Sequence, residues 1–142
     1  MELTINIAPL LIIRLGKKWK PAQEEIERGY FRAGQGWHPN LTDLELADSV
    51  RAWWKVSEKT LEKKGIEHVV AYADGRTQAL YRIVSVLGPR DKGGRIAFQL
   101  EPIKSGDLFE QVIGDDGKEV PFRPGSANPV RYWPPKNKSA HT

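Results

Sequence analysis

The residues best suited to binding chemistry gather in the segment RAWWKV, residues 51–56. If this segment is an extended strand, alternation separates two cations and one tryptophan from the apolar residues and the other tryptophan. The first face then holds Arg51, Trp53 and Lys55, and the second holds Ala52, Trp54 and Val56. An indole between cations can stack on a nucleobase while the cations hold phosphates. Alternatively, Trp53 packs beneath a helix and the two cations extend past it to solvent.

Two further segments carry side chains that suit the same kind of ligand. Trp37 lies in the glycine-rich segment 29–40, which we predict to be a loop, and there it could line a pocket for an unstacked base or could plug one end of a barrel. Asn128 and Arg131 stand beside two aromatic residues near the end of the chain. An amide can read a base edge and a guanidinium can hold a phosphate, although an asparagine before a proline is also an ordinary turn residue.

The sequence contains no linear motif of an enzyme. Its three histidines, at positions 38, 68 and 141, lack metal-ligand spacing, and it has no cysteine, so we expect no metal site. The patterns GxxxxGK[ST], GxSxG and HExxH are absent, and we therefore expect neither a catalytic residue nor a cofactor. A catalytic site assembled from His68, Tyr81 and nearby acids is the alternative.

Composition favours one compact domain with an anionic partner. A chain of 142 residues with 39% apolar content is the size of a single domain, which we place at 1–135, followed by a disordered tail at 136–142. The net charge of +4 divides into −1 for residues 1–50 and +5 for residues 51–142. No apolar run is long enough for a bilayer, and no secretion signal or cysteine is present, so we expect a cytoplasmic protein without membrane contact.

End signals predict two short helices on either side of the RAWWKV segment. Thr42 and Glu45 fit a capping box, which starts a helix that runs to about Val50. Ser57 repeats the arrangement, and Gly65 supplies a left-handed stop for the second helix.

The pair Asp74-Gly75 predicts a two-residue hairpin, because both central positions need a positive φ. Such a loop places His68 opposite Tyr81. Further strands are predicted at 3–7, 10–15, 95–103, 110–113 and 130–133, turns at 88–94 and 115–117, and a third helix at 21–29. Many short strands with short flanking helices predict an α+β fold with a bent mixed or antiparallel sheet, or a partly closed β-barrel.

The order AWWKVS, a short helix, HVVAYADGRTQALYRI, a strand with Phe98 and then GSANPVRYW resembles small bacterial domains of the PUA-like group, which includes the EVE, YTH and ASCH families. The resemblance covers about residues 50–133 and lacks an ASCH-type glycine-lysine-threonine motif. It implies a bent barrel with flanking helices, and RNA binding or an aromatic cage for a modified, flipped-out base. The implied cage residues are Trp37, Trp53 and Trp54, of which the alternation argument keeps Trp37 and Trp53.

The leading hypothesis is therefore a non-catalytic nucleic-acid-binding domain, in which DNA and RNA remain open as ligands. The residues assigned to binding are Arg51, Trp53, Lys55, Trp37, Asn128 and Arg131. The alternative is a protein-interaction module or a homodimeric structural protein without a nucleic-acid ligand. The sequence leaves the oligomeric state open.

Overall fold

A computed structural model describes residues 2–3, 8–27, 30–88, 94–121 and 128–134. The strands are β1 (Leu10–Arg14), β2 (Lys20–Glu27), β3 (Tyr30–Gln35), β4 (His68–Ala73), β5 (Arg76–Leu87), β6 (Ala97–Ile103) and β7 (Val130–Trp133). The helices are α1 (Asp43–Arg51), α2 (Glu58–Lys64) and α3 (Asp107–Val112). The predicted α+β class is confirmed.

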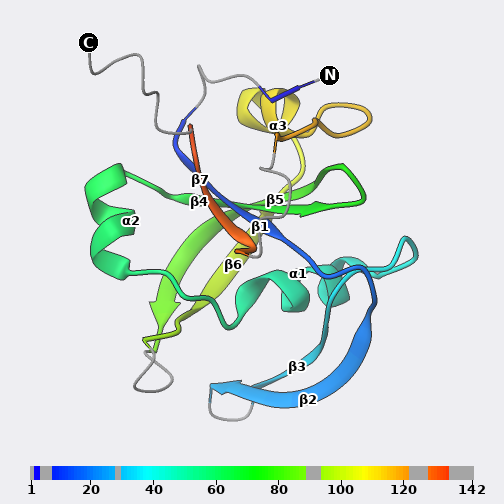
Figure 1. Cartoon of the computed structure of the whole chain (residues 1–142), viewed down its shortest axis with the longest axis vertical. Coiled ribbons are helices and arrows are strands. Elements are labelled where there is room, and N and C mark those ends of the chain that lie inside the picture. Colours follow the sequence, from blue (N-terminus) through cyan, green and yellow to red (C-terminus); the bar gives the residue numbers. More distant parts are fainter. Residues whose placement is uncertain (1, 4–7, 28–29, 89–93, 122–127, 135–142) are drawn as a thin grey trace.

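The main element is a five-stranded mixed sheet in the order β6-β5-β4-β1-β7 (Figure 1). β1 and β4 are parallel, and the other neighbouring pairs are antiparallel. β2 and β3 form a separate antiparallel pair. The strands within the described ranges form no closed barrel.

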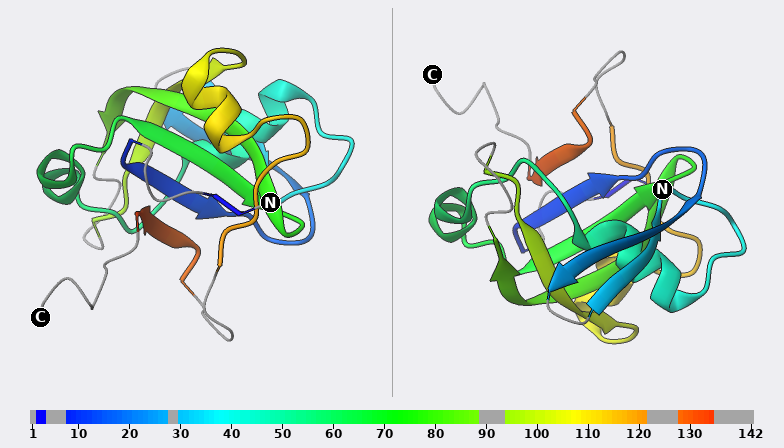
Figure 2. Two further views of the ribbon diagram at one scale, coloured as in Figure 1. Left: turned by 90° about the horizontal axis from the view of Figure 1, so that it is seen from above. Right: turned by 90° about the horizontal axis from the view of Figure 1, so that it is seen from below.

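Successive residues along β1 and β4 point alternately to the two faces of the sheet, and both sets are apolar. Both faces must therefore be covered, and helices cover each of them. The cluster on the side of α1 and α2 includes Leu11, Ile13, Val50, Leu61 and Val69. The cluster on the side of α3 includes Leu10, Ile12, Val70 and Val112. The two views in Figure 2 place α3 on one side of the sheet and α1 with the β2-β3 pair on the other. None of the described helices has the length and apolar character needed to cross a bilayer.

Local signals set the ends of α1 and α2 as predicted. Thr42 accepts a hydrogen bond from the backbone N–H of Glu45, and the Glu45 side chain accepts one from the N–H of Thr42, which completes the capping box. The Ser57 hydroxyl caps α2, and Gly65 ends it with φ +68°. Both predicted helices are therefore confirmed.

The hairpin turn is confirmed, but its predicted register is wrong beyond the first two pairs, Ala73 with Arg76 and Tyr72 with Thr77. Asp74 and Gly75 have φ values of 53° and 78°, as a two-residue turn requires. A β-bulge then places an extra residue, Gln78, in β5. The bulge shifts the pairing by one, so His68 lies opposite Arg82 and not opposite Tyr81.

Three other sequence predictions are wrong. The segment predicted as a helix at 21–29 extends as β2 to Glu27, because pairing with β3 satisfies its backbone groups and overrides weak helix signals. For the same reason, residues 30–35 form β3 and not a loop. The strand predicted at 110–113 lies mostly in α3, which follows Gly106 and has Asp107 and Glu110 in its first turn, where acids suit a helix.

The remaining predicted elements have mixed outcomes. Strands are confirmed at 10–14, 97–103 and 130–133, and the last of these pairs with β1 at the edge of the sheet. Residues 4–7, 89–93 and 136–142, which belong to a predicted strand, a turn and the tail, lie outside the described residues.

Candidate nucleic-acid interface

The segment 51–56 is not the extended strand that the sequence predicts. α1 continues through Arg51. In residues 52–56, the strand pairing is limited to one isolated antiparallel bridge, between Trp54 and Ile96. The helix prevails because Arg51 in its last turn pairs with Asp48 three residues earlier, with Nε 3.4 Å from Oδ1. The common face predicted for Trp53 and its two neighbouring cations therefore does not form.

Trp53 instead lines a cavity of about 340 Å³, which we call the Trp53 cavity. Its walls come from the loop after β1, the end of β3, the end of α1 and Pro129 just before β7. The charged and aromatic lining consists of Arg14, Lys18, Lys20, Trp53 and Trp54. None of the described lining residues is acidic. The cavity thus combines aromatic rings with positive charge, which suits a flat anionic ligand.

Two glycines, one in β3 and one directly after it, allow the basic loop to pack closely. A Cβ at Gly36, where φ is +93°, would lie 2.0 Å from the carbonyl oxygen of Lys18. A Cβ at Gly34 would lie 2.4 Å from the Trp19 indole and 2.6 Å from the carbonyl oxygen of Lys20. Any side chain at these positions would push the loop away, so the glycines hold Lys18 and Lys20 beside the cavity.

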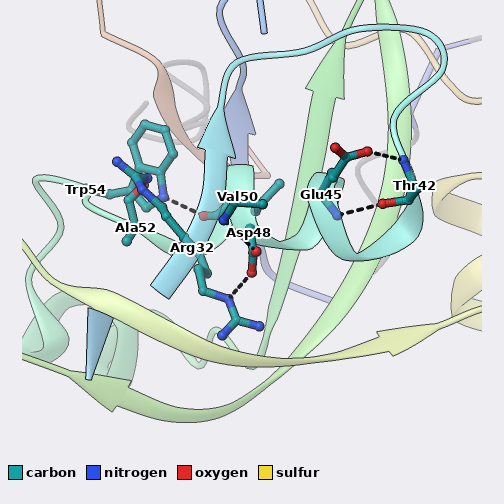
Figure 3. A network of polar contacts seen from close by, with 9 residues as sticks. Arg32, Thr42, Glu45, Asp48, Val50, Ala52 and Trp54 are labelled. Atoms are coloured by element: carbon teal, nitrogen blue, oxygen red, sulfur yellow. Dashed lines mark hydrogen bonds and ion pairs between the residues drawn. The ribbon is translucent and has the colours of Figure 1, made fainter. Parts of the chain in front are cut away.

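The two indoles are fixed before any ligand arrives. Trp54 donates from Nε1 to the carbonyl oxygen of Val50 at 2.5 Å (Figure 3). The Trp54 backbone also exchanges two hydrogen bonds with Ile96, at 2.9 and 3.0 Å. Trp53 packs against the small buried cluster of Ala52 and Ala97 and stays half-buried. Because binding would not have to order these rings, the entropic cost of contact with a ligand is reduced.

Buried polar side chains tie β3 to α1 behind the cavity. Asp48, which is 1% exposed, accepts a hydrogen bond from the backbone N–H of Ala33 at 2.9 Å through Oδ2. Arg32, which is 5% exposed, donates to the carbonyl oxygen of Ala52 and, at 3.2 Å, to Gln35 Oε1. These contacts fix Ala52 and Gln35, which both line the Trp53 cavity.

Trp37 lines a second cavity of about 840 Å³, which we call the Trp37 cavity. It lies between Trp37, the tip of the β4-β5 hairpin and the loop after β1. Its charged lining is Arg14, Lys17 and Asp74. Trp37 also packs against the core cluster on the α1 side and is half-buried. Its position is compatible with the predicted pocket-lining role, whereas the described strands form no closed barrel that the ring could plug.

The two cations predicted beside Trp53 lie elsewhere. The Arg51 side chain is 12% exposed, and it lines a different, largely apolar cavity between α1 and β5. Lys55 is exposed and does not line the Trp53 cavity. Neither of the two cations therefore lines the cavity that Trp53 lines.

Asn128 and Arg131 make local contacts around β7. Asn128 Oδ1 accepts a hydrogen bond from the backbone N–H of Val130 at 3.0 Å, which is the turn role that the sequence also allowed. Arg131 is half-buried and donates from Nη1 to the carbonyl oxygen of Pro121 at 3.1 Å. Only Pro129, between them, lines the Trp53 cavity.

The alternative catalytic pair is not assembled, because His68 and Tyr81 are not opposite one another. Partial burial lowers the pKa of His68, and burial raises the pKa of Tyr81 above its ordinary range, so Tyr81 stays protonated near neutral pH. Among the described residues, no group of three or more His, Asp or Glu side chains is arranged to hold a metal ion.

Sequence reasoning missed the cations that do line the Trp53 cavity: Arg14, Lys18 and Lys20. Their signal is the motif GKKWK at residues 16–20, where a glycine and an aromatic residue accompany a basic run shortly after β1. Basic runs with an interleaved aromatic residue are typical of nucleic-acid contacts.

Comparison with known proteins assigns no relative to the chain. No family model matches it, and neither the curated proteins nor the solved structures contain a significant match. The resemblance to the PUA-like group therefore stays a prediction, and the candidate site rests on its own geometry.

Proposed function

We propose that the protein binds nucleic acid without catalysing a reaction and holds an unstacked base against Trp53. The observation that carries this proposal is the Trp53 cavity itself, in which two fixed indoles meet three cations. Its volume of about 340 Å³ falls within the range of about 300–1,000 Å³ that is typical of ligand sites.

The charges around the cavity support an anionic ligand over a neutral one. Arg14, Lys18 and Lys20 come from one short stretch of chain, at the end of β1 and the start of β2, so their positive fields add at one wall. Lys18 and Lys20 are both exposed to solvent, so a ligand can reach them. A base on Trp53 would place its phosphates toward these side chains, while Gln35 offers an amide for the base edge.

This arrangement changes which residues we assign to phosphate binding. Asp48 pairs with Arg51, and burial of that pair removes the guanidinium from the ligand-facing surface. The proposal therefore gives the phosphate role to Arg14, Lys18 and Lys20, and keeps Trp53 as the stacking ring. Recognition of a modified base is a narrower form of the same proposal, in which Trp54 forms a second wall.

The first test measures the affinity of fluorescein-labelled single-stranded DNA and RNA of mixed sequence by fluorescence polarisation. Trp53→Ala should weaken binding by about 1–3 kcal/mol, because the base no longer has a ring on which to stack, and Trp53→Phe should restore part of the affinity. Absence of binding by the wild-type protein at low salt, or binding that Trp53→Ala leaves unchanged, overturns the proposal.

Salt dependence tests the phosphate assignment separately. Log affinity for a single strand falls with log salt concentration, with a slope of about 0.7 for each phosphate that the protein neutralises. The double variant Lys18→Ala/Lys20→Ala should make this slope shallower by about 0.7 for each phosphate contact that it loses. Lys59→Ala/Lys63→Ala is the matched control, because it removes the same charge from exposed positions on α2. Equal slopes for the two double variants would show that binding is a diffuse response to net charge.

A protein-interaction role is the second candidate, and one observation favours it. Leu44 on α1 is 62% exposed beside the apolar cavity of about 590 Å³ that lies between α1, β5 and β6. If this surface binds a second copy, Leu44→Lys should abolish a dimer detected by light scattering. A wild-type protein that is monomeric at high concentration removes the homodimer form of this candidate.

A further inference from the structure

We infer that the nucleic acid is single-stranded and places two bases in separate cavities, one at Trp53 and one at Trp37, with its backbone crossing the chain at Gly16. This inference rests on the proposed function and specifies its ligand. It assigns Trp37 and Lys17 to binding together with the residues of the Trp53 cavity.

The two cavities share one wall. Arg14, Leu15 and Gly16 line both of them, so the cavities lie on either side of the same three residues. Each cavity has its own tryptophan, and the volumes of about 340 and 840 Å³ each suffice for a ligand group the size of a base with its sugar. A ligand that fills both must pass over the shared wall.

Gly16 is the position in that wall without a side chain. A Cβ added there would meet no atom within 4 Å, and its φ lies outside the positive range in which glycine is favoured. The described fold therefore does not need glycine at this position for packing or for conformation. A glycine without such a need suits a place where a ligand backbone approaches closely.

Cations lie along the proposed crossing. Arg14 lines both cavities, Lys17 lines the Trp37 cavity, and Lys18 lines the Trp53 cavity. A phosphate that joins the two bases would therefore meet positive charge on either side of the wall. Asp74 is the acid on the lining of the Trp37 cavity, and its carboxylate repels phosphate but can accept a hydrogen bond from a base.

The geometry selects single strands over duplexes. In a duplex the bases are stacked and paired, so neighbouring bases can enter two cavities only after they are unpaired and extruded, which costs free energy. A single strand can splay its bases at little cost. We therefore expect a single strand to bind more tightly than a duplex of the same sequence, by about tenfold or more.

The test compares a labelled single-stranded DNA decamer, its duplex and deoxyadenosine monophosphate as competitor. Gly16→Leu fills the crossing, and Gly16→Ala is its matched control, because the site accepts a small side chain. Trp37→Ala removes the second stacking ring and should weaken decamer binding about 5- to 150-fold. Gly16→Leu should weaken decamer binding in the same direction, and both variants should weaken the decamer by a larger factor than the monophosphate, which occupies one cavity at a time.

Three outcomes separate the inference from the proposed function. Selective loss of decamer affinity in Gly16→Leu and Trp37→Ala, with Gly16→Ala near wild type, supports the two-base site. If Trp53→Ala weakens decamer binding while Gly16→Leu and Trp37→Ala do not, the site holds one base, and the inference fails while the proposed function survives. If the wild-type protein binds none of the three probes, both fail. Trp37→Ala could be unfolded, because Trp37 packs against the core. Gly16→Leu requires no change in the packed core, so its effect on decamer affinity still tests the two-base site in that case.

Discussion

Replacement of Gly36 by alanine should displace the loop that carries Lys18 and should weaken both the fold and ligand binding. The added Cβ would lie 2.0 Å from the carbonyl oxygen of Lys18 and 2.8 Å from its carbonyl carbon. Both are backbone atoms, so no side-chain rotation relieves the overlap. Either the loop or the end of β3 must move, and the Trp53 cavity changes shape because Gly36 and Lys18 both line it.

The expected cost has two parts that the structure separates. A residue other than glycine at φ +93° costs about 1–2 kcal/mol, and forced overpacking costs about 1–3 kcal/mol more. Gly65→Ala provides the control, since its φ is +68° and its added Cβ would meet nothing within 4 Å. This control should therefore show the first cost alone, and Gly36→Ala should exceed it by about 1–3 kcal/mol.

Urea unfolding followed by tryptophan fluorescence measures both free energies, and fluorescence polarisation measures binding of a single-stranded decamer. Gly36→Ala should lower the free energy of unfolding by about 2–5 kcal/mol and should weaken binding, whereas Gly65→Ala should leave binding unchanged. Equal destabilisation by the two substitutions would refute the close packing of the loop on Gly36. Unchanged binding in folded Gly36→Ala would refute the role of that loop.

Two further predictions address the supporting structure. Asp48→Ala should lower the free energy of unfolding by about 3–5 kcal/mol in urea titrations, because it leaves the largely buried Arg51 without this carboxylate. Asp43→Ala is the control, since it breaks an exposed pair with Lys104 and should cost under about 1 kcal/mol. Similar losses of unfolding free energy in the two variants would contradict the account. Burial lowers the pKa of His68 below its ordinary 6.5, so the unfolded chain binds more protons between the two pKa values and stability should rise with pH through that window. His68→Gln should reduce this rise in urea titrations at pH 5 to 7, and an unchanged pH profile would exclude His68 as its source.

Local signals allowed much of the fold to be predicted from the sequence. The capping box at Thr42, the Gly65 stop and the Asp74-Gly75 turn depend on a few neighbouring residues, and each forms as predicted. The β-bulge at Gln78 has no comparable signal, because it depends on how β5 meets the rest of the sheet. The predicted cross-strand pairing of His68 with Tyr81 was wrong for that reason.

Long-range pairing decided the predictions that failed. The acidic run after Pro21 suits a helix terminus, but β3 offers strand partners that the local sequence does not reveal. Likewise, alternation in the segment 51–56 assumed a strand, whereas the Arg51–Asp48 pair lies within the last turn of α1.

The candidate site could be predicted only in part because its wall is assembled from distant segments. Trp53 was identified from its indole and its neighbouring charges, and it does line a cavity. The cations beside it come from the end of β1, the loop after it and the start of β2, which lie 33 to 39 residues before Trp53 in the sequence. They approach Trp53 because that stretch packs on Gly34 and Gly36. No local pattern in the sequence connects these segments.

Photo-crosslinking tests the central claim most directly. Single-stranded DNA that carries 5-bromodeoxyuridine is irradiated with the protein, and mass spectrometry identifies the crosslinked residues. The account predicts crosslinks at Trp53, with their loss in Trp53→Ala and their suppression by unlabelled single-stranded competitor. Crosslinks confined to surfaces away from the Trp53 cavity, such as the lysines of α2, would contradict it.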